Sequence, residues 1–161
     1  MFRLIMLTLP IVSVLLRGGL FVGEAVAQQK TLKEQLVGSW LLISNTNSRP
    51  DGTRVDTFGP APKGVAFFDI NDHFSLVLVR SDLPKFASNN RVAGTADENK
   101  AVVQGSIAYF GTYTINEADK IATVQIEGST FPNWVGATQK RLVEISGDEL
   151  TLINTPASAG G

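Results

Sequence analysis

Two tyrosines and a glutamate are the groups of this chain best suited to hold a small molecule or to move a proton. Tyr109 and Tyr113 stand four residues apart in one predicted strand, so their side chains share a face. A buried tyrosine hydroxyl needs a hydrogen-bond partner, which a ligand can supply. Glu127 ends another predicted strand and could act as an acid or base if it points inward. Its alternation with Thr123 and Gln125 leaves inward and outward orientations open.

Further aromatic side chains and one arginine complete the set of candidate ligand contacts. Phe131 and Trp134 lie in a predicted loop and add apolar surface that could line a cavity. Gly111, between the two tyrosines, leaves a gap for a ligand or a neighbouring side chain. Arg80 ends a predicted strand and could pair with a ligand carboxylate through two hydrogen bonds. Ordinary core packing is the alternative for the aromatic residues, and a solvated strand end is the alternative for Arg80.

The sequence lacks the catalytic motifs and metal-ligating residues of several common enzyme classes. It has no cysteine and a single histidine, His73, in a predicted surface turn, which disfavours a zinc site. The nucleophile-elbow, dinucleotide and phosphate-loop motifs are missing from the sequence. We therefore expect no catalytic residue of these types and no cofactor. The formal charge is −1 and Lys140-Arg141 is the only adjacent basic pair, so we expect no nucleic-acid partner.

Residues 1–27 are predicted to be a signal peptide. Arg3 provides a positive start, an apolar run follows, and Ala25-Val26-Ala27 forms a cleavage motif before Gln28. The run is shorter than the roughly 20 apolar residues that cross a bilayer. We therefore expect a secreted or periplasmic protein whose mature chain, 28–161, is one domain without a membrane anchor. An uncleaved N-terminal anchor is the alternative.

The mature chain reads as a series of short strands with two helices. Thr31 and Thr95 are each followed three residues later by a glutamate, the pattern of a capping box, so a short helix should begin at each. Turn residues separate the strand segments, as in an all-β barrel or sandwich. The predicted strands are 40–46, 53–58, 64–70, 74–79, 107–115, 121–127, 139–145 and 150–154, with the inserted helix at 96–104.

The sequence resembles the bacterial and fungal lipocalin-like domain family. Gly38-Ser39-Trp40 has the form of the G-x-W motif that opens the first lipocalin strand. The segments 58–69, 86–98, 108–115 and 127–136 are similar, in order and spacing, to segments of that family. The resemblance implies an antiparallel up-and-down barrel with a central cavity, in which Trp40 sits at the closed end under the N-terminal helix. It implies no particular reaction, because a fold alone does not give a function.

The chain departs from the family pattern in two ways. Members often carry a His-His pair where this chain has Val124 and Gln125, so any acid–base or metal role of that pair is lost here. Members also usually continue past residues 159–161 into one more strand, which leaves open whether the last barrel strand is missing. A missing strand would expose two unpaired edges and favour weak self-association, unless 53–58 folds over to close the gap.

These observations favour a binding protein for a small apolar or amphiphilic molecule. The alternative is a barrel enzyme of the isomerase or cyclase type that uses tyrosine and glutamate groups. A third reading is a structural domain with a filled core. Contact between an inward Tyr113 and an inward Glu127 would favour the enzyme.

Overall fold

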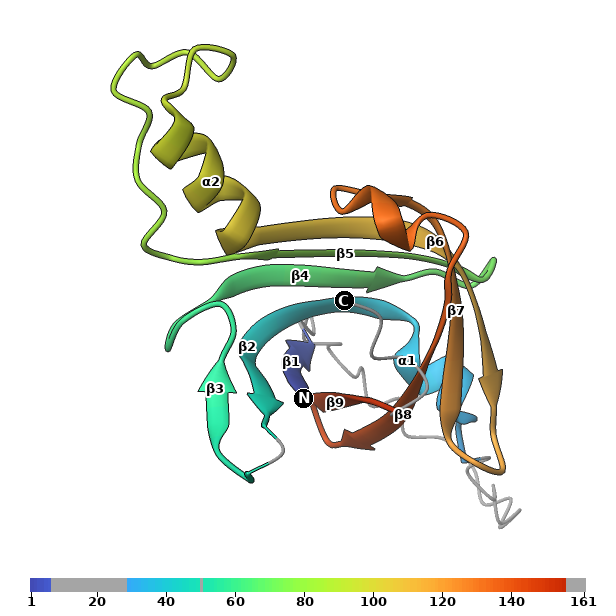
Figure 1. Cartoon of the computed structure of the whole chain (residues 1–161). Helices are drawn as coiled ribbons and strands as arrows, with labels where there is room; N and C mark the ends of the chain where they lie inside the picture. Colours follow the sequence, from blue (N-terminus) through green and yellow to red (C-terminus); the bar gives the residue numbers. More distant parts are fainter. Residues whose placement is uncertain (7–28, 50, 156–161) are drawn as a thin grey trace, which may run out of the picture.

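The protein folds as a closed barrel of eight antiparallel strands with two short helices (Figure 1). The computed structural model describes residues 1–6, 29–49 and 51–155. The barrel strands follow the order β1-β9-β8-β7-β6-β5-β4-β2, and β1 pairs with β2 to close the circle. The predicted all-β barrel with a short first helix and one inserted helix is confirmed.

Most elements agree closely with the predicted ranges. They are β1 Phe2–Met6, α1 Leu32–Leu36, β2 Gly38–Ser48, β3 Arg54–Asp56, β4 Lys63–Phe68, β5 His73–Val79, α2 Ala96–Gly105, β6 Ser106–Asn116, β7 Ile121–Ser129, the 3-10 turn η1 Pro132–Trp134, β8 Thr138–Ser146 and β9 Glu149–Asn154. Both predicted capping boxes are present, at Thr31 with Glu34 and at Thr95 with Glu98.

The core follows from the alternation of side chains along each strand. In β5, Phe74, Leu76 and Leu78 are buried, while the residues between them face outward or lie at the surface. In β7, Ala122, Val124 and Ile126 are buried in the same way. Because strand side chains alternate between faces, one set fills the barrel and the other meets solvent.

The strand position whose occupation the sequence left open, between β2 and β9, is filled by β1. Phe2–Met6 pairs antiparallel with β2 on one side and with β9 on the other (Figure 1). The structure with residues 1–6 in place therefore has no gap, which answers the question that the sequence left open. The segment expected as an alternative closure, β3, pairs only with Thr46–Ser48 of β2 and does not bridge to β9.

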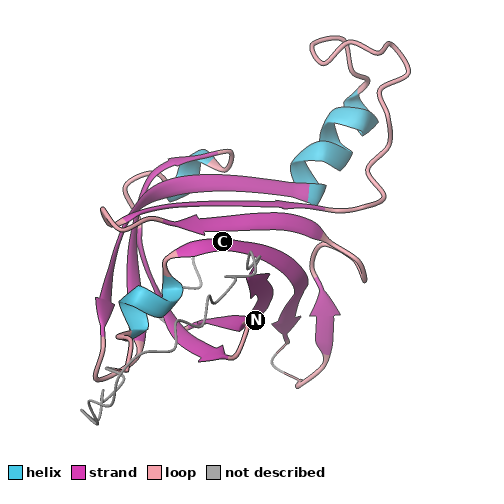
Figure 2. Cartoon of the chain, turned by 180° about the vertical axis from the view of Figure 1, so that it is seen from behind, coloured by secondary structure: helices cyan, strands magenta, loops and turns pink. Residues whose placement is uncertain are grey.

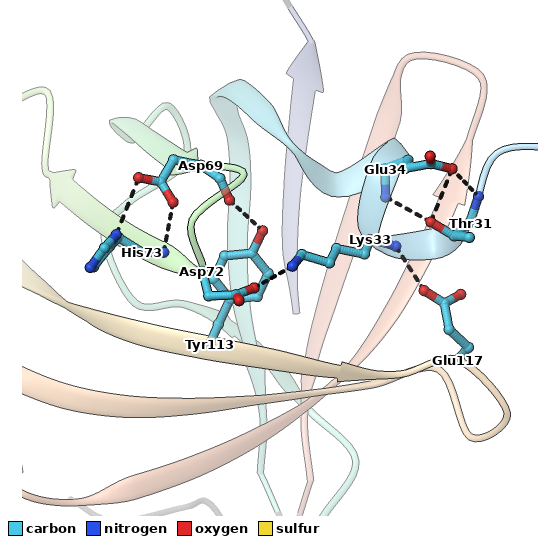
Figure 3. Close-up of polar contacts among 8 residues, drawn as sticks. All are labelled: Thr31, Lys33, Glu34, Asp69, Asp72, His73, Tyr113 and Glu117. Carbon is cyan, nitrogen blue, oxygen red and sulfur yellow. Dashed lines mark hydrogen bonds and ion pairs between the residues drawn. The ribbon is translucent and has the colours of Figure 1, made fainter.

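Helix α1 covers the closed end of the barrel. The Glu117 carboxylate accepts a hydrogen bond from the backbone N–H of Leu32 at 2.8 Å. It accepts a second from the backbone N–H of Lys33 at 3.1 Å, which Figure 3 shows. Lys33 pairs with Asp72 at 2.6 Å. Beneath the helix, the buried Trp40 donates its indole N–H to the Leu36 carbonyl at 2.8 Å. The predicted position of Trp40 under the N-terminal helix is confirmed.

Helix α2 marks the opposite end. It leads directly into the first residue of β6, whereas α1 is bound to Glu117, just beyond the last residue of β6. Figure 2 shows α2 and the loop before it projecting away from the barrel. The two ends of the barrel are therefore built differently, one plugged by α1 and one bordered by α2.

Candidate functional site

A cavity of about 400 Å³ lies at the α2 end of the barrel. Its volume falls within the range of about 300–1,000 Å³ that is usual for small-molecule sites. Strands β1, β2, β5, β6, β8 and β9 contribute to it, together with α2 and two loops. The apolar side chains that line it are Phe2, Phe58, Leu78, Val103, Ile107, Tyr109, Phe131 and Trp134.

Three buried polar side chains gather in this cavity. Asn45, Gln139 and Arg141 are the buried polar or charged residues of the described chain, and all three line the cavity. Arg141 donates from Nη2 to the Gln139 Oε1 at 2.6 Å and to the Tyr109 hydroxyl at 3.1 Å. Its guanidinium carbon also lies 5.7 Å from the centre of the Tyr109 ring. The cavity therefore combines an apolar wall with one polar, positively charged side.

Tyr109 joins the polar side of the cavity to an aromatic wall. Its ring meets Phe74 and Trp134 edge to face, with centroid distances of 5.8 and 5.4 Å. Edge-to-face pairs of this kind contribute about 0.5–1.5 kcal/mol each beyond the burial of their surface. Burial raises the pKa of the Tyr109 hydroxyl, and the nearby Arg141 charge lowers it in part. The net pKa is raised, so the hydroxyl stays protonated and can donate a hydrogen bond.

Phe131 and Trp134 form the outer part of the aromatic wall. The loop that follows β7 turns through η1 and places the two rings edge to face, 5.7 Å apart. Phe131 is exposed and Trp134 is partly buried, so the pair leads from solvent towards Tyr109. Three of the six predicted contact residues, Tyr109, Phe131 and Trp134, therefore line one cavity.

Tyr113 faces inward as predicted but lies in the other half of the barrel. It is buried, and its hydroxyl donates to the Asp69 carbonyl at 2.8 Å (Figure 3). Its ring packs edge to face on Phe68 at 5.2 Å. Burial, together with the nearby Asp72 and Asp69 charges, raises its pKa to about 12. Tyr113 is not among the residues that line the cavity.

Arg80 and Glu127 also lie outside the cavity. Arg80 is exposed and pairs with Asp82 through Nε and Nη2, at 2.9 and 2.7 Å. Glu127 is exposed, on the face opposite the buried Ile126, which decides the question that its alternation left open. The structure therefore does not bring Tyr113 and Glu127 together as an acid–base pair.

The gap expected at Gly111 is filled by backbone. A side chain at this position would meet the Gln125 carbonyl oxygen at 1.9 Å, beside a register shift between Phe110 and Gly111 in the pairing of β6 and β7. Glycine is needed here for the close approach of the two strands. The space admits neither a ligand nor a neighbouring side chain.

Arg141, Gln139 and Asn45 were missed by the sequence analysis. Arg141 was considered only as half of an adjacent basic pair. A signal was nevertheless present, because Gln139 and Arg141 share the parity of the buried Val143 in β8. Polar residues on the inward face of a barrel strand indicate a lumen that is not purely a packed core.

Neither a metal site nor a spanning helix is seen in the part of the chain that the structure describes. There, His, Cys, Asp and Glu side chains form no group of three or more that could hold a metal ion. No helix in residues 1–6, 29–49 and 51–155 has the length and apolar character needed to cross a membrane.

Comparisons with known proteins agree with this architecture. Residues 37–159 match the model of the lipocalin-like domain family. The chain is also 30% identical, over 84 residues, to a protein of Aspergillus oryzae named 4'-hydroxy-3'-methoxypropiophenone carrier protein. The match covers 48% of this chain and 76% of that protein. No solved structure matches the chain. Since the family model covers most of its length, the chain belongs to the lipocalin-like domain family.

Proposed function

We propose that this protein carries a small aromatic molecule in the cavity at the α2 end of its barrel. The observation that supports the proposal most directly is the convergence of the buried polar side chains on one cavity with an aromatic wall. In a core packed only for stability, burying these polar side chains would cost free energy, because polar groups need hydrogen-bond partners when buried. A ligand in the cavity can supply such partners.

The Aspergillus oryzae relative supports the aromatic character of the cargo. Its name describes a carrier for a small aromatic ketone that bears hydroxyl and methoxy groups. Such a ligand offers a flat ring for edge contacts with Tyr109 and Trp134, and oxygen atoms for the polar side. A carrier needs only to bind and release its cargo, so the separation of Tyr113 from Glu127 presents no difficulty.

Tryptophan fluorescence provides a direct test. The chain has two tryptophans, Trp134 at the cavity and Trp40 at the closed end. Titration with 4'-hydroxy-3'-methoxypropiophenone should quench the emission of the Trp40→Phe variant saturably and leave that of Trp134→Phe nearly unchanged. At 100 times the dissociation constant, bound ligand should stabilise the wild type by about 2.7 kcal/mol and raise its melting temperature.

The control variant for this titration is Tyr113→Phe, which changes a buried tyrosine outside the cavity. It should bind with the affinity of the wild type. Equal quenching of the two tryptophan variants, or a wild-type melting temperature that no aromatic ketone raises, would contradict the proposal.

Export is a second part of the proposal. It rests on Arg3, the apolar run and the cleavage motif before Gln28. Cleavage before Gln28 would also remove β1 and the cavity residue Phe2, so the exported chain would keep the rest of the cavity wall but would need another strand between β2 and β9. N-terminal sequencing of the protein recovered from outside the host's cytoplasm should begin at Gln28. Recovery of the protein only from the cytoplasm, with Met1 at its start, would contradict export.

A further inference from the structure

Arg141 is a buried cation without a matching anion in the described chain. It is 4% exposed and lies on the inward face of β8. The described ion pairs join Arg3 to Glu149, Lys33 to Asp72, His73 to Asp69 and Arg80 to Asp82, all with solvent-exposed side chains. Buried charges in proteins are ordinarily paired, because an unpaired one loses its hydration without compensation.

Most of the N–H groups of Arg141 also donate no hydrogen bond to the described residues. A guanidinium carries five N–H groups, on Nε, Nη1 and Nη2. Both hydrogen bonds that described residues accept from Arg141 come from Nη2. Nε is enclosed and has no acceptor among the described residues. The side chain is therefore held in position by Gln139 and Tyr109 but is not satisfied by them.

The neighbours of Arg141 present further donors to the same space. The Tyr109 hydroxyl accepts from Arg141, so its own proton is free to be donated to a ligand. Gln139 also lines the cavity and accepts from Arg141 through its carbonyl oxygen, so its two amide N–H groups remain as donors. A positive charge and several N–H or O–H donors around one cavity form a site for an acceptor with negative charge.

We propose that the cargo binds through an anionic oxygen, a carboxylate or an ionised phenol, that pairs with Arg141 while its aromatic ring lies against Trp134 and Tyr109. This inference rests on the proposed carrier function and names the chemical class of the cargo. Neutral aromatic molecules of the same size would leave the guanidinium unpaired and bind more weakly.

The test compares two probes of nearly equal size, 2-naphthoate and its neutral methyl ester, by calorimetric titration of the full chain at pH 7.5. The wild type should bind 2-naphthoate at least about tenfold more tightly than the ester, as expected for a charge-assisted hydrogen bond. Arg141→Met should abolish this preference, and Arg141→Lys should retain part of it. The control Lys140→Met removes the neighbouring charge from an exposed position of β8 and should keep the wild-type preference.

A phenol arm uses 4-nitrophenol, whose ionised form absorbs visible light. Binding to the wild type should shift its ionisation to lower pH, and binding to Arg141→Met should not. If the wild type prefers 2-naphthoate but does not shift the ionisation of 4-nitrophenol, the cargo carries a carboxylate. If it shifts 4-nitrophenol but does not prefer 2-naphthoate, the cargo carries an ionised phenol. Both results support an anionic cargo.

The stability of the ligand-free variant gives an independent readout. Replacement of an unpaired buried cation by an apolar side chain should keep or raise the melting temperature of Arg141→Met. If Arg141→Met is more stable than the wild type but binds 2-naphthoate more weakly, then Arg141 serves ligand binding and not the stability of the barrel. A marked loss of stability would show instead that Arg141 holds the barrel together, and would overturn the inference.

Two binding outcomes separate this inference from the carrier proposal. Equal affinity of the wild type for the ester and for 2-naphthoate, unchanged in Arg141→Met, overturns the anionic cargo and leaves the carrier function standing. Failure of the wild type to bind both probes and the aromatic ketone contradicts the carrier function, and the inference falls with it.

Discussion

At the scale of single residues, two aromatic side chains hold the closed end of the barrel. Trp40 is buried and bonded to the last turn of α1, and Tyr113 is buried and bonded to the Asp69 carbonyl. Each anchors one segment of chain to another, so the closed end is fixed independently of the cavity at the other end.

Trp40→Ala should lower the free energy of unfolding by about 3–5 kcal/mol, because it opens a large cavity in the core. Denaturant unfolding followed by circular dichroism measures this loss. Trp134→Ala, at the partly buried rim, is the matched control and should cost clearly less. A loss below about 1 kcal/mol for Trp40→Ala would show that Trp40 carries no core packing.

The raised pKa of Tyr113 predicts a loss of stability at high pH. Its value rises from 10.0 to about 12 on folding, so the folded protein holds the phenolic proton more tightly than the unfolded chain. The contribution is therefore complete below about pH 10 and is lost as the pH rises through about 12. Unfolding measured from pH 8 to 12 should show this decline in the wild type and a shallower one in Tyr113→Phe. Identical profiles would contradict it.

At the scale of elements, β1 is the strand that the family resemblance did not lead us to expect. Leu4 is 1% exposed and points into the core, whereas its neighbour Ile5 is 47% exposed on the outside. The residue before β1 is bound to the barrel as well, because the Met1 amino group donates to the Thr46 carbonyl at 2.5 Å. β1 therefore has the two-faced pattern of a genuine barrel strand.

Two aspartate substitutions, one on each face of β1, test whether the strand is part of the barrel. Leu4→Asp in the full chain should strongly destabilise the fold, since it buries an unpaired carboxylate. Ile5→Asp introduces the same charge on the solvent side and should change the melting temperature little. Equal melting temperatures of the two variants would show that residues 2–6 are not part of the barrel.

At the scale of the whole molecule, closure depends on a strand from the far end of the sequence. Removal of residues 1–27, the predicted signal peptide, would leave β2 and β9 with unpaired edges. Such edges pair readily with other chains. The 28–161 chain should therefore self-associate in size-exclusion chromatography, and a peptide of residues 1–6 added in excess should restore the monomer. A monomeric, stable 28–161 chain would contradict this expectation.

Local signals in the sequence determined most of the elements. The two capping boxes set the starts of α1 and α2, and period-two alternation set which side chains of β6 and β7 share a face. These features depend on neighbours within a few residues, so they can be predicted without the rest of the fold. The same alternation correctly placed Tyr109 and Tyr113 on one face.

Only the tertiary structure decided which of those side chains share a site. Tyr109 and Tyr113 are equivalent by parity, but four residues of strand carry them to opposite halves of the barrel. Arg141 meets Tyr109 across 32 positions of sequence, and β1 meets β9 across the whole chain. Such contacts depend on barrel closure and strand register, which no short sequence pattern specifies. The sequence by itself thus determined strands β2 to β9, the helix starts and which side chains share a face. The closed barrel decided that β1 completes the sheet, which way Glu127 points, and where the cavity and its charge lie.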